Sequence, residues 1–212
     1  MIYFFTVYLI FLYLVSSYIL NNKKLINNNL LEHQIFINRS VPLVGGIFLL
    51  FPVFFFFSSL NKFTLFIYFN LFLLGTLSDF NYLSSAKKRF LIQIGIVVFF
   101  VFMSKLEVTP TRIEVIDNLF NNSIVSYTFT AFCLLILING SNFIDGINLN
   151  LIGYYLIINL VLLILFYDQE IDLNFYNLKI SIFFLLMIFI LNSSGKVISG
   201  DSGAYLISLN FG

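Results

Sequence analysis

The sequence is poor in charged residues and in residues that form covalent or metal cross-links. Lys, Arg, Asp and Glu make up 10% of its 212 residues, too few for the polar surface of a soluble domain. The net charge of +1 gives no global field that would indicate nucleic acid. Cys133 is the single cysteine, which excludes an internal disulfide and a cysteine-built metal site. His33 is the single histidine, and we interpret it as a solvated loop residue.

What the chain has in abundance is long apolar runs. Apolar residues make up 60% of the sequence, and Phe alone occurs 29 times. The runs are continuous and show no alternation of period two, which favours membrane-spanning helices over a barrel. We therefore predict an all-α, polytopic transmembrane bundle in one domain, 1–212. An eighth span is expected to begin near Gly203. The seven complete spans expected before it are 1–20, 43–60, 63–78, 89–104, 124–139, 151–167 and 179–191. The first run lacks a basic leader and a cleavage site, so it is predicted to be a retained helix.

The loops between these runs predict the orientation. One set of loops covers 21–42, 79–89, 140–150 and 192–202, and it holds seven Lys or Arg residues. The other set covers 61–62, 105–123 and 168–179, and it holds four basic residues and six acids. The positive-inside rule places the first set in the cytoplasm and the N-terminus outside.

Four polar motifs fall in or beside the predicted cytoplasmic loops. The first is Pro-Leu-Val-Gly-Gly at 42–46, where paired glycines allow close approach to a ligand or, equally, to another helix. The second ends one apolar run at Asp79 and is followed by the basic run Lys87-Lys88-Arg89. Asp79 is either an end-cap or a functional group, and the basic run is either a membrane anchor or a phosphate clamp.

The other two motifs lie later in the chain. The segment 139–148 carries three Asn, one Asp and two Gly, more polar side chains than a simple turn needs. Amide and carboxylate oxygens suit ribose, base edges or a hard cation. The segment 196–203 reads Lys-Val-Ile-Ser-Gly-Asp-Ser-Gly and opens the last apolar run. It is either a site that faces phosphate or a helix N-cap made by Asp201 or Ser202.

Together the four motifs resemble the polyprenyl-phosphate N-acetylhexosamine-1-phosphate transferases, whose cytoplasmic loops share their order and spacing. The resemblance runs from about Arg39 to Gly212. Its most specific parts are Asn-x-x-Asn-x-x-Asp-Gly at 139–146 and Lys-x-x-x-Gly-Asp-Ser-Gly at 196–203. The form at 42–46 is closer to the branch that transfers GlcNAc 1-phosphate than to the phospho-N-acetylmuramoyl-pentapeptide branch.

The resemblance implies a bacterial inner-membrane enzyme that transfers a sugar 1-phosphate from a UDP-sugar to undecaprenyl phosphate and releases UMP. Its implied partners are these two substrates and the membrane, and a homodimer is compatible with it. The implied Mg²⁺ ligands are Asp201 and Asn142. The implied catalytic residues are Asp79, Arg89 and Asp145. The implied substrate-binding residues are Gly45, Gly46, Asn139, Asn148, which aligns with a position that reads uracil, and Lys196.

The sequence also departs from this family. Ser78 stands where the family has the first aspartate of a pair, a proposed base for the lipid phosphate. A phosphomonoester is already largely dianionic at neutral pH, so we interpret Ser78 as tolerated. The apolar run that starts near Gly203 is short and the fifth, His-rich family loop is not found, so a C-terminally truncated chain is expected. The rival class is a non-enzymatic transporter or anion-binding protein, but transporters place binding residues near the bilayer midplane.

Overall fold

The fold is all-helical, as the apolar runs predicted. The computed structural model describes residues 2–21, 43, 45–56, 61–146, 149–166, 173–195 and 197–211, and within them it has helices and no strand. The helices are α1 (Ile2–Asn21), α2 (Gly45–Phe56), α3 (Lys62–Asp79), α4 (Ala86–Ser104), α5 (Glu114–Phe120), α6 (Ser123–Ile144), α7 (Asn150–Leu165), α8 (Leu173–Ser193) and α9 (Gly200–Phe211).

Two predicted boundaries are wrong in an informative way. The helix predicted to end at residue 139 continues as α6 to Ile144, so most of the third polar motif is helical rather than a loop. The first asparagine side chain of this motif bonds within the helix, because Asn139 Nδ2 donates to the Leu135 carbonyl at 2.8 Å. The predicted loop 105–123 contains the short helix α5, whose first turn carries Glu114 and Asp117. Acids in a first turn stabilise a helix N-terminus.

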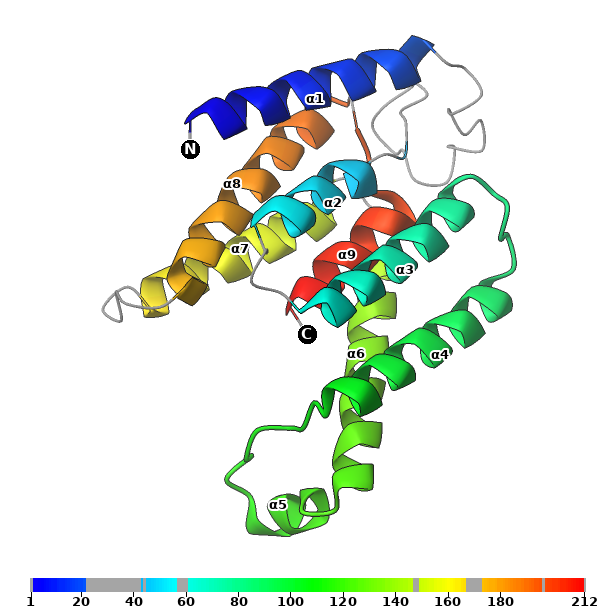
Figure 1. The fold of residues 1–212 in the computed structure, drawn as a ribbon, viewed down its shortest axis with the longest axis vertical. Coiled ribbons are helices and arrows are strands. Elements are labelled where there is room, and N and C mark those ends of the chain that lie inside the picture. The colour runs from blue at the N-terminus through cyan, green and yellow to red at the C-terminus, as the bar shows by residue number, and fades with distance from the viewer. Residues whose placement is uncertain are drawn as a thin grey trace.

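Helix α9 lies at the centre of the bundle. Figure 1 shows it, in red, among α2, α3 and α6, and these three helices make its main contacts. Most of its side chains are buried, including Ala204, Tyr205 and Leu206. An apolar helix that is buried on nearly all sides takes much of its stability from this burial. The last described helix of the chain therefore holds together helices that end more than fifty residues earlier.

Side-chain hydrogen bonds join α6, α7 and α8. The hydroxyls of Ser141 in α6 and Tyr155 in α7 lie 2.6 Å apart. Ser181 in α8 donates to Asn159 Oδ1 in α7 at 2.5 Å, and Asn159 Nδ2 donates back to the Tyr155 carbonyl at 2.8 Å. Hydrogen bonds between apolar helices fix their register. These bonds tie α6, α7 and α8 into one unit.

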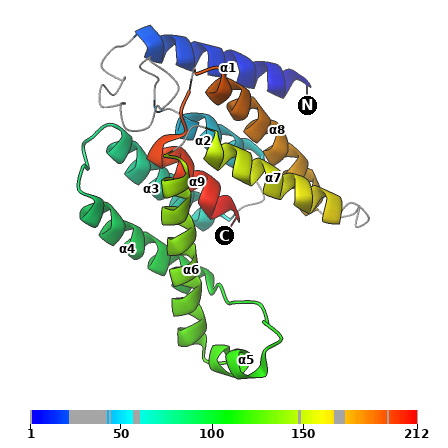
Figure 2. The same ribbon diagram turned by 180° about the vertical axis from the view of Figure 1, so that it is seen from behind.

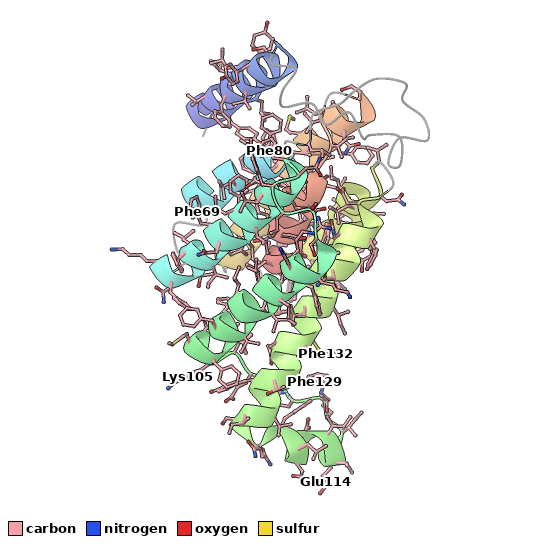
Figure 3. All side chains as sticks on the ribbon, turned by 90° about the vertical axis from the view of Figure 1, so that its right-hand side faces the viewer. Phe69, Phe80, Lys105, Glu114, Phe129 and Phe132 are labelled. Carbon is pink, nitrogen blue, oxygen red and sulfur yellow. The ribbon has the colours of Figure 1, made fainter. Side chains whose placement is uncertain are left out.

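Two of the predicted loops, 79–89 from one set and 105–123 from the other, lie toward opposite ends of the molecule. Figure 3 shows Phe80, just after α3, toward one end, and Lys105 and Glu114 toward the other. Figure 2 shows α6 running from α5 at the lower end up to α9. The end of α3 and the end of α6, which carry two of the polar motifs, therefore reach the same region beside α9.

Helix lengths support only part of the predicted span count. Within the described residues, α6 is long and apolar enough to cross a membrane, and α7 and 178–193 are shorter apolar helices. Large apolar side chains such as Phe129 and Phe132 stand exposed on α6 (Figure 3). Seven complete spans and a cytoplasmic location of the motif loops stay predictions.

Candidate active site

The site is built around the first turn of α9, which is pressed against α2. The segment before α9 pairs with the segment before α2 through an isolated parallel bridge between Leu43 and Ile198. The Gly45 N–H donates to the Ile198 carbonyl at 2.9 Å. Segments from the first and fourth polar motifs are therefore joined by their backbones.

Glycines make this close approach feasible. A Cβ added to Gly46 would lie 2.2 Å from the Ser202 Oγ, and one added to Gly75 in α3 would lie 2.3 Å from the Ser202 Cα. A Cβ added to Gly45 would lie 2.5 Å from the Ser199 Cα. None of these distances is compatible with van der Waals packing. The geometry supports the helix-packing alternative for the paired glycines, and a direct contact of Gly45 or Gly46 with substrate stays a prediction.

Asp79 caps α9 from another helix. Its Oδ1 accepts the backbone N–H of Asp201 at 2.8 Å, and its Oδ2 accepts the N–H of Ser202 at 3.1 Å and the Ser202 hydroxyl at 2.7 Å. A helix N-terminus has unpaired N–H groups and a partial positive charge, so a carboxylate stabilises it. Gly200 has a φ of +68°, and a Cβ there would lie 2.8 Å from both Asp79 oxygens. The alternative that Asp201 or Ser202 caps this helix is wrong, because α9 begins at Gly200 and Asp79 supplies the carboxylate.

The Asp201 side chain faces the opposite way, toward α4. Its Oδ2 accepts from Arg89 Nη1 at 2.5 Å and from the Ser78 hydroxyl at 2.5 Å. Arg89 also donates to Ser78, which closes a triangle of three side chains from α3, α4 and α9. The side chains of Arg89 and Asp201 are 23% and 20% exposed, whereas Ser78 is buried. The ion pair therefore has access to solvent, while the residues that hold it in place do not.

Asp145 directly follows α6 and adds a third carboxylate. Burial raises the pKa of Asp145 well above its usual range, polar groups of Ser199 and Gly200 oppose this, and the charges of Asp79 and Asp201 add to the rise. Asp145 therefore lies close to the carboxylates of Asp79 and Asp201. Carboxylates this close raise one another's pKa, and a bound cation would relieve their repulsion.

The chemistry of this region suits Mg²⁺ rather than a soft metal. Among the described residues no three His, Cys, Asp or Glu side chains form a metal-binding cluster. Mg²⁺ does not require one, because it binds through one or two carboxylates and completes its shell with water and substrate phosphates. Asp201, on the partly exposed side of α9, supplies an oxygen donor of this type.

The structure brings together only part of the predicted site. Asp79, Arg89, Asp145 and Asp201 converge, as described above. Asn142 is partly buried on α6, three residues before Asp145. Asn139 is on the same helix, but its amide nitrogen donates to the Leu135 carbonyl of that helix. The remaining predicted site residues, Asn148 and Lys196, lie outside the described part of the chain, as does the predicted loop residue His33.

Sequence reasoning missed a second contact between α4 and α9. Gln93 follows Arg89 by four residues, and Tyr205 follows Asp201 by four, so each pair shares one helix face. Gln93 and Tyr205 are both buried, and their side chains lie close together. The signal was present as an amide inside an apolar run at helical spacing from Arg89. The contact places α4 so that Arg89 reaches Asp201.

Comparison with known proteins identifies the family of the chain. No curated protein and no solved structure matches the chain. A family model does match, and it covers residues 61–212 of the 212-residue chain, including α3 to α9 and every carboxylate described above. The matched region begins just before the helix that carries Ser78 and Asp79. The chain belongs to glycosyl transferase family 4.

Proposed function

We propose that the chain is a membrane enzyme that transfers a sugar 1-phosphate from a UDP-sugar to undecaprenyl phosphate and releases UMP. The observation that carries the proposal is the contact between Asp201 and Arg89, which unites two motifs 112 residues apart in a family of glycosyl transferases. A carboxylate that can bind a cation and a guanidinium that can bind phosphate are the two groups that a nucleotide diphosphate needs.

In this proposal each residue has a separate task. Asp201 and Asn142 would hold Mg²⁺, which when bound neutralises the donor diphosphate and stabilises the leaving UMP. Asp79 keeps the first turn of α9 in place and so fixes the direction of Asp201. Arg89 would bind phosphate oxygens, and Lys196 stays a predicted substrate-binding residue outside the described part of the chain.

The reaction requires little proton transfer. An oxygen of the lipid phosphate attacks the β-phosphorus of the UDP-sugar, the bond from this phosphorus to the bridging oxygen breaks, and UMP leaves. The attacking phosphate has a second pKa of about 6 and is therefore already charged at neutral pH. Asp145 lies in the same region, where its high pKa allows it to hold a proton near the reacting phosphates.

The proposal includes a membrane location. The apolar helix α6 would span the bacterial inner membrane, and the ends of α3 and α6 that carry Asp79 and Asp145 would face the cytoplasm, where UDP-sugars occur. The full arrangement has seven spans and the N-terminus outside. An enzyme at this interface can reach a soluble nucleotide sugar and a lipid-borne phosphate together.

GlcNAc 1-phosphate is the proposed group, and the Pro-Leu-Val-Gly-Gly form at 42–46 is its support. The alternatives are transfer of phospho-N-acetylmuramoyl-pentapeptide and a non-enzymatic role in anion binding or transport. The test is UMP release by the purified protein in detergent with Mg²⁺, undecaprenyl phosphate and either UDP-GlcNAc or UDP-N-acetylmuramoyl-pentapeptide.

UMP is expected from UDP-GlcNAc, and Asp201→Asn should lower its rate by about a hundredfold or more. Asp117→Asn is the matched control, since it neutralises an exposed acid of α5 far from the site and should retain activity. UMP from the pentapeptide donor alone would select the peptidoglycan branch. Folded protein that releases no UMP from either donor would refute the enzymatic proposal.

A further inference from the structure

One of the two carboxylate oxygens of Asp201, Oδ2, is already in use. A carboxylate oxygen has two lone pairs, and both lone pairs of Asp201 Oδ2 are directed to donors: Arg89 Nη1 and the Ser78 hydroxyl, each at 2.5 Å. An oxygen that accepts two such bonds cannot also ligate a metal ion. The described arrangement therefore holds the guanidinium where a cation on this oxygen would lie.

We propose that Arg89 is a built-in placeholder for the metal ion: it neutralises Asp201 until Mg²⁺ binds, and the metal releases it to the substrate phosphates. The inference rests on the proposed function, because it takes Asp201 as the metal ligand. It also specifies the order of events at the site. Mg²⁺ and Arg89 first compete for one oxygen of Asp201, and they then act together on the diphosphate.

The surroundings of the pair favour this exchange. Asp79 and Asp145 interact electrostatically with Asp201, so the region is short of positive charge if Arg89 leaves without a replacement. A divalent ion replaces the one charge of Arg89 with two. Both partners of the ion pair are about one fifth exposed, so a hydrated ion can approach and the arginine can turn outward.

The backbone of Asp201 does not have to move during the exchange. Asp79 holds the N–H groups of Asp201 and Ser202, and this cap is independent of the bonds made by the Asp201 carboxylate. Ser78 bridges the two members of the ion pair, because its hydroxyl donates to Asp201 and accepts from Arg89. A serine here holds the pair with hydrogen bonds and adds no further negative charge to compete for the guanidinium.

The test measures metal binding directly, without substrate or turnover. Mn²⁺ shares the preference of Mg²⁺ for carboxylate and water oxygen, and its free concentration can be followed by electron paramagnetic resonance. The wild type, Arg89→Gln, Arg89→Lys and Lys88→Gln are compared in detergent at fixed ionic strength. Lys88→Gln is the matched control, because it removes the same charge from the adjacent, exposed position of α4.

Arg89→Gln is expected to bind Mn²⁺ about tenfold more tightly than the wild type. Lys88→Gln should stay near the wild type. Arg89→Lys should fall between the wild type and Arg89→Gln, because lysine keeps the charge but loses the guanidinium fork. Asp201→Asn should abolish this binding in either background, which assigns the Mn²⁺ to Asp201. Circular dichroism and the melting temperature establish that each variant is folded, and Arg89→Lys carries the test if Arg89→Gln does not fold.

Equal or weaker Mn²⁺ binding by Arg89→Gln would overturn the placeholder, since it would mean that Arg89 orients Asp201 for the metal instead of competing with it. In that case the metal assignment and the proposed function would stand. Folded wild type and Arg89→Gln that both fail to bind Mn²⁺ would instead overturn the metal assignment itself.

Discussion

Replacing Asp79 with alanine is expected to destabilise the bundle, because this carboxylate is the cap of its central helix. The change removes the acceptor of three hydrogen bonds, two from backbone N–H groups and one from the Ser202 hydroxyl. Loss of an N-cap costs about 1 kcal/mol. Leaving the buried Ser202 groups unpaired costs roughly 1–3 kcal/mol more.

Two further effects set the net magnitude. Removing Asp79 relieves its repulsion with Asp145 and Asp201, which offsets part of the loss. We expect a net decrease of roughly 2–3 kcal/mol in the free energy of unfolding, which for a chain of this size lowers Tm by about 5–10 °C. Thermal unfolding in detergent, followed by circular dichroism, measures this change. Asp79→Asn should lose less, because its amide keeps one oxygen that can accept an N–H.

Asp117 provides a control with the same bonding pattern. It also accepts two backbone N–H bonds and one hydroxyl bond, from Thr111 and Arg112, but it lies exposed in α5. Asp117→Ala should therefore lower Tm much less than Asp79→Ala and leave activity intact. If Asp79→Ala melts within about 1 °C of the wild type, Asp79 does not hold α9 in place, and a purely chemical role for this aspartate would be favoured.

Three more substitutions test the packing and the charges. Gly75→Ala should lower the free energy of unfolding by about 2 kcal/mol or more, because its Cβ would lie 2.3 Å from the Ser202 backbone. Gly95→Ala on α4 is the control, since it has free space and should be neutral or slightly stabilising. Thermal unfolding compares the two variants. Asp145→Asn should raise Tm and abolish UMP release. As the pH falls through the raised pKa of Asp145 toward 3.8, the wild type should gain stability relative to this variant. The reason is that the Asp145 carboxyl of the wild type takes up a proton in the folded state and the asparagine does not. A rise in Tm that is the same at every pH would contradict this linkage. Ser78→Asp should change turnover by less than tenfold, and a hundredfold rise, equal to roughly 2.7 kcal/mol of barrier, would mean that a carboxylate base is needed at this position.

The sequence predicted which motifs belong together but not how they touch. The motif resemblance grouped Asp79, Arg89, Asp145 and Asp201, and the structure brings these four into one region. Their contacts join helices that are more than fifty residues apart, and no local pattern encodes such contacts. The ion pair of Arg89 with Asp201 is an example, because it exists only once α4 and α9 pack.

Helix ends show why local rules were insufficient. The usual N-cap is a side chain within one or two residues of the helix start, so Asp201 and Ser202 were reasonable candidates for α9. The cap instead comes from Asp79, a residue 122 positions earlier, and Asp201 is left free to turn toward Arg89. Similarly, residues 139–144 are rich in polar side chains and look like a loop, but they continue α6 because polar side chains do not prevent the backbone hydrogen bonds of a helix.

The central position of α9 has a consequence for biosynthesis. This helix leaves the ribosome after α2, α3 and α6, so each of them is synthesised before the helix that packs against it exists. Until then the Asp79 carboxylate lacks the N–H groups that it accepts in the finished protein, and Arg89 lacks Asp201. The bundle can therefore complete its packing only after α9 has been synthesised. A nascent chain halted before residue 200 should be bound by chaperones or degraded, and synthesis of the first turn of α9 should supply the missing partners of Asp79 and Arg89 together.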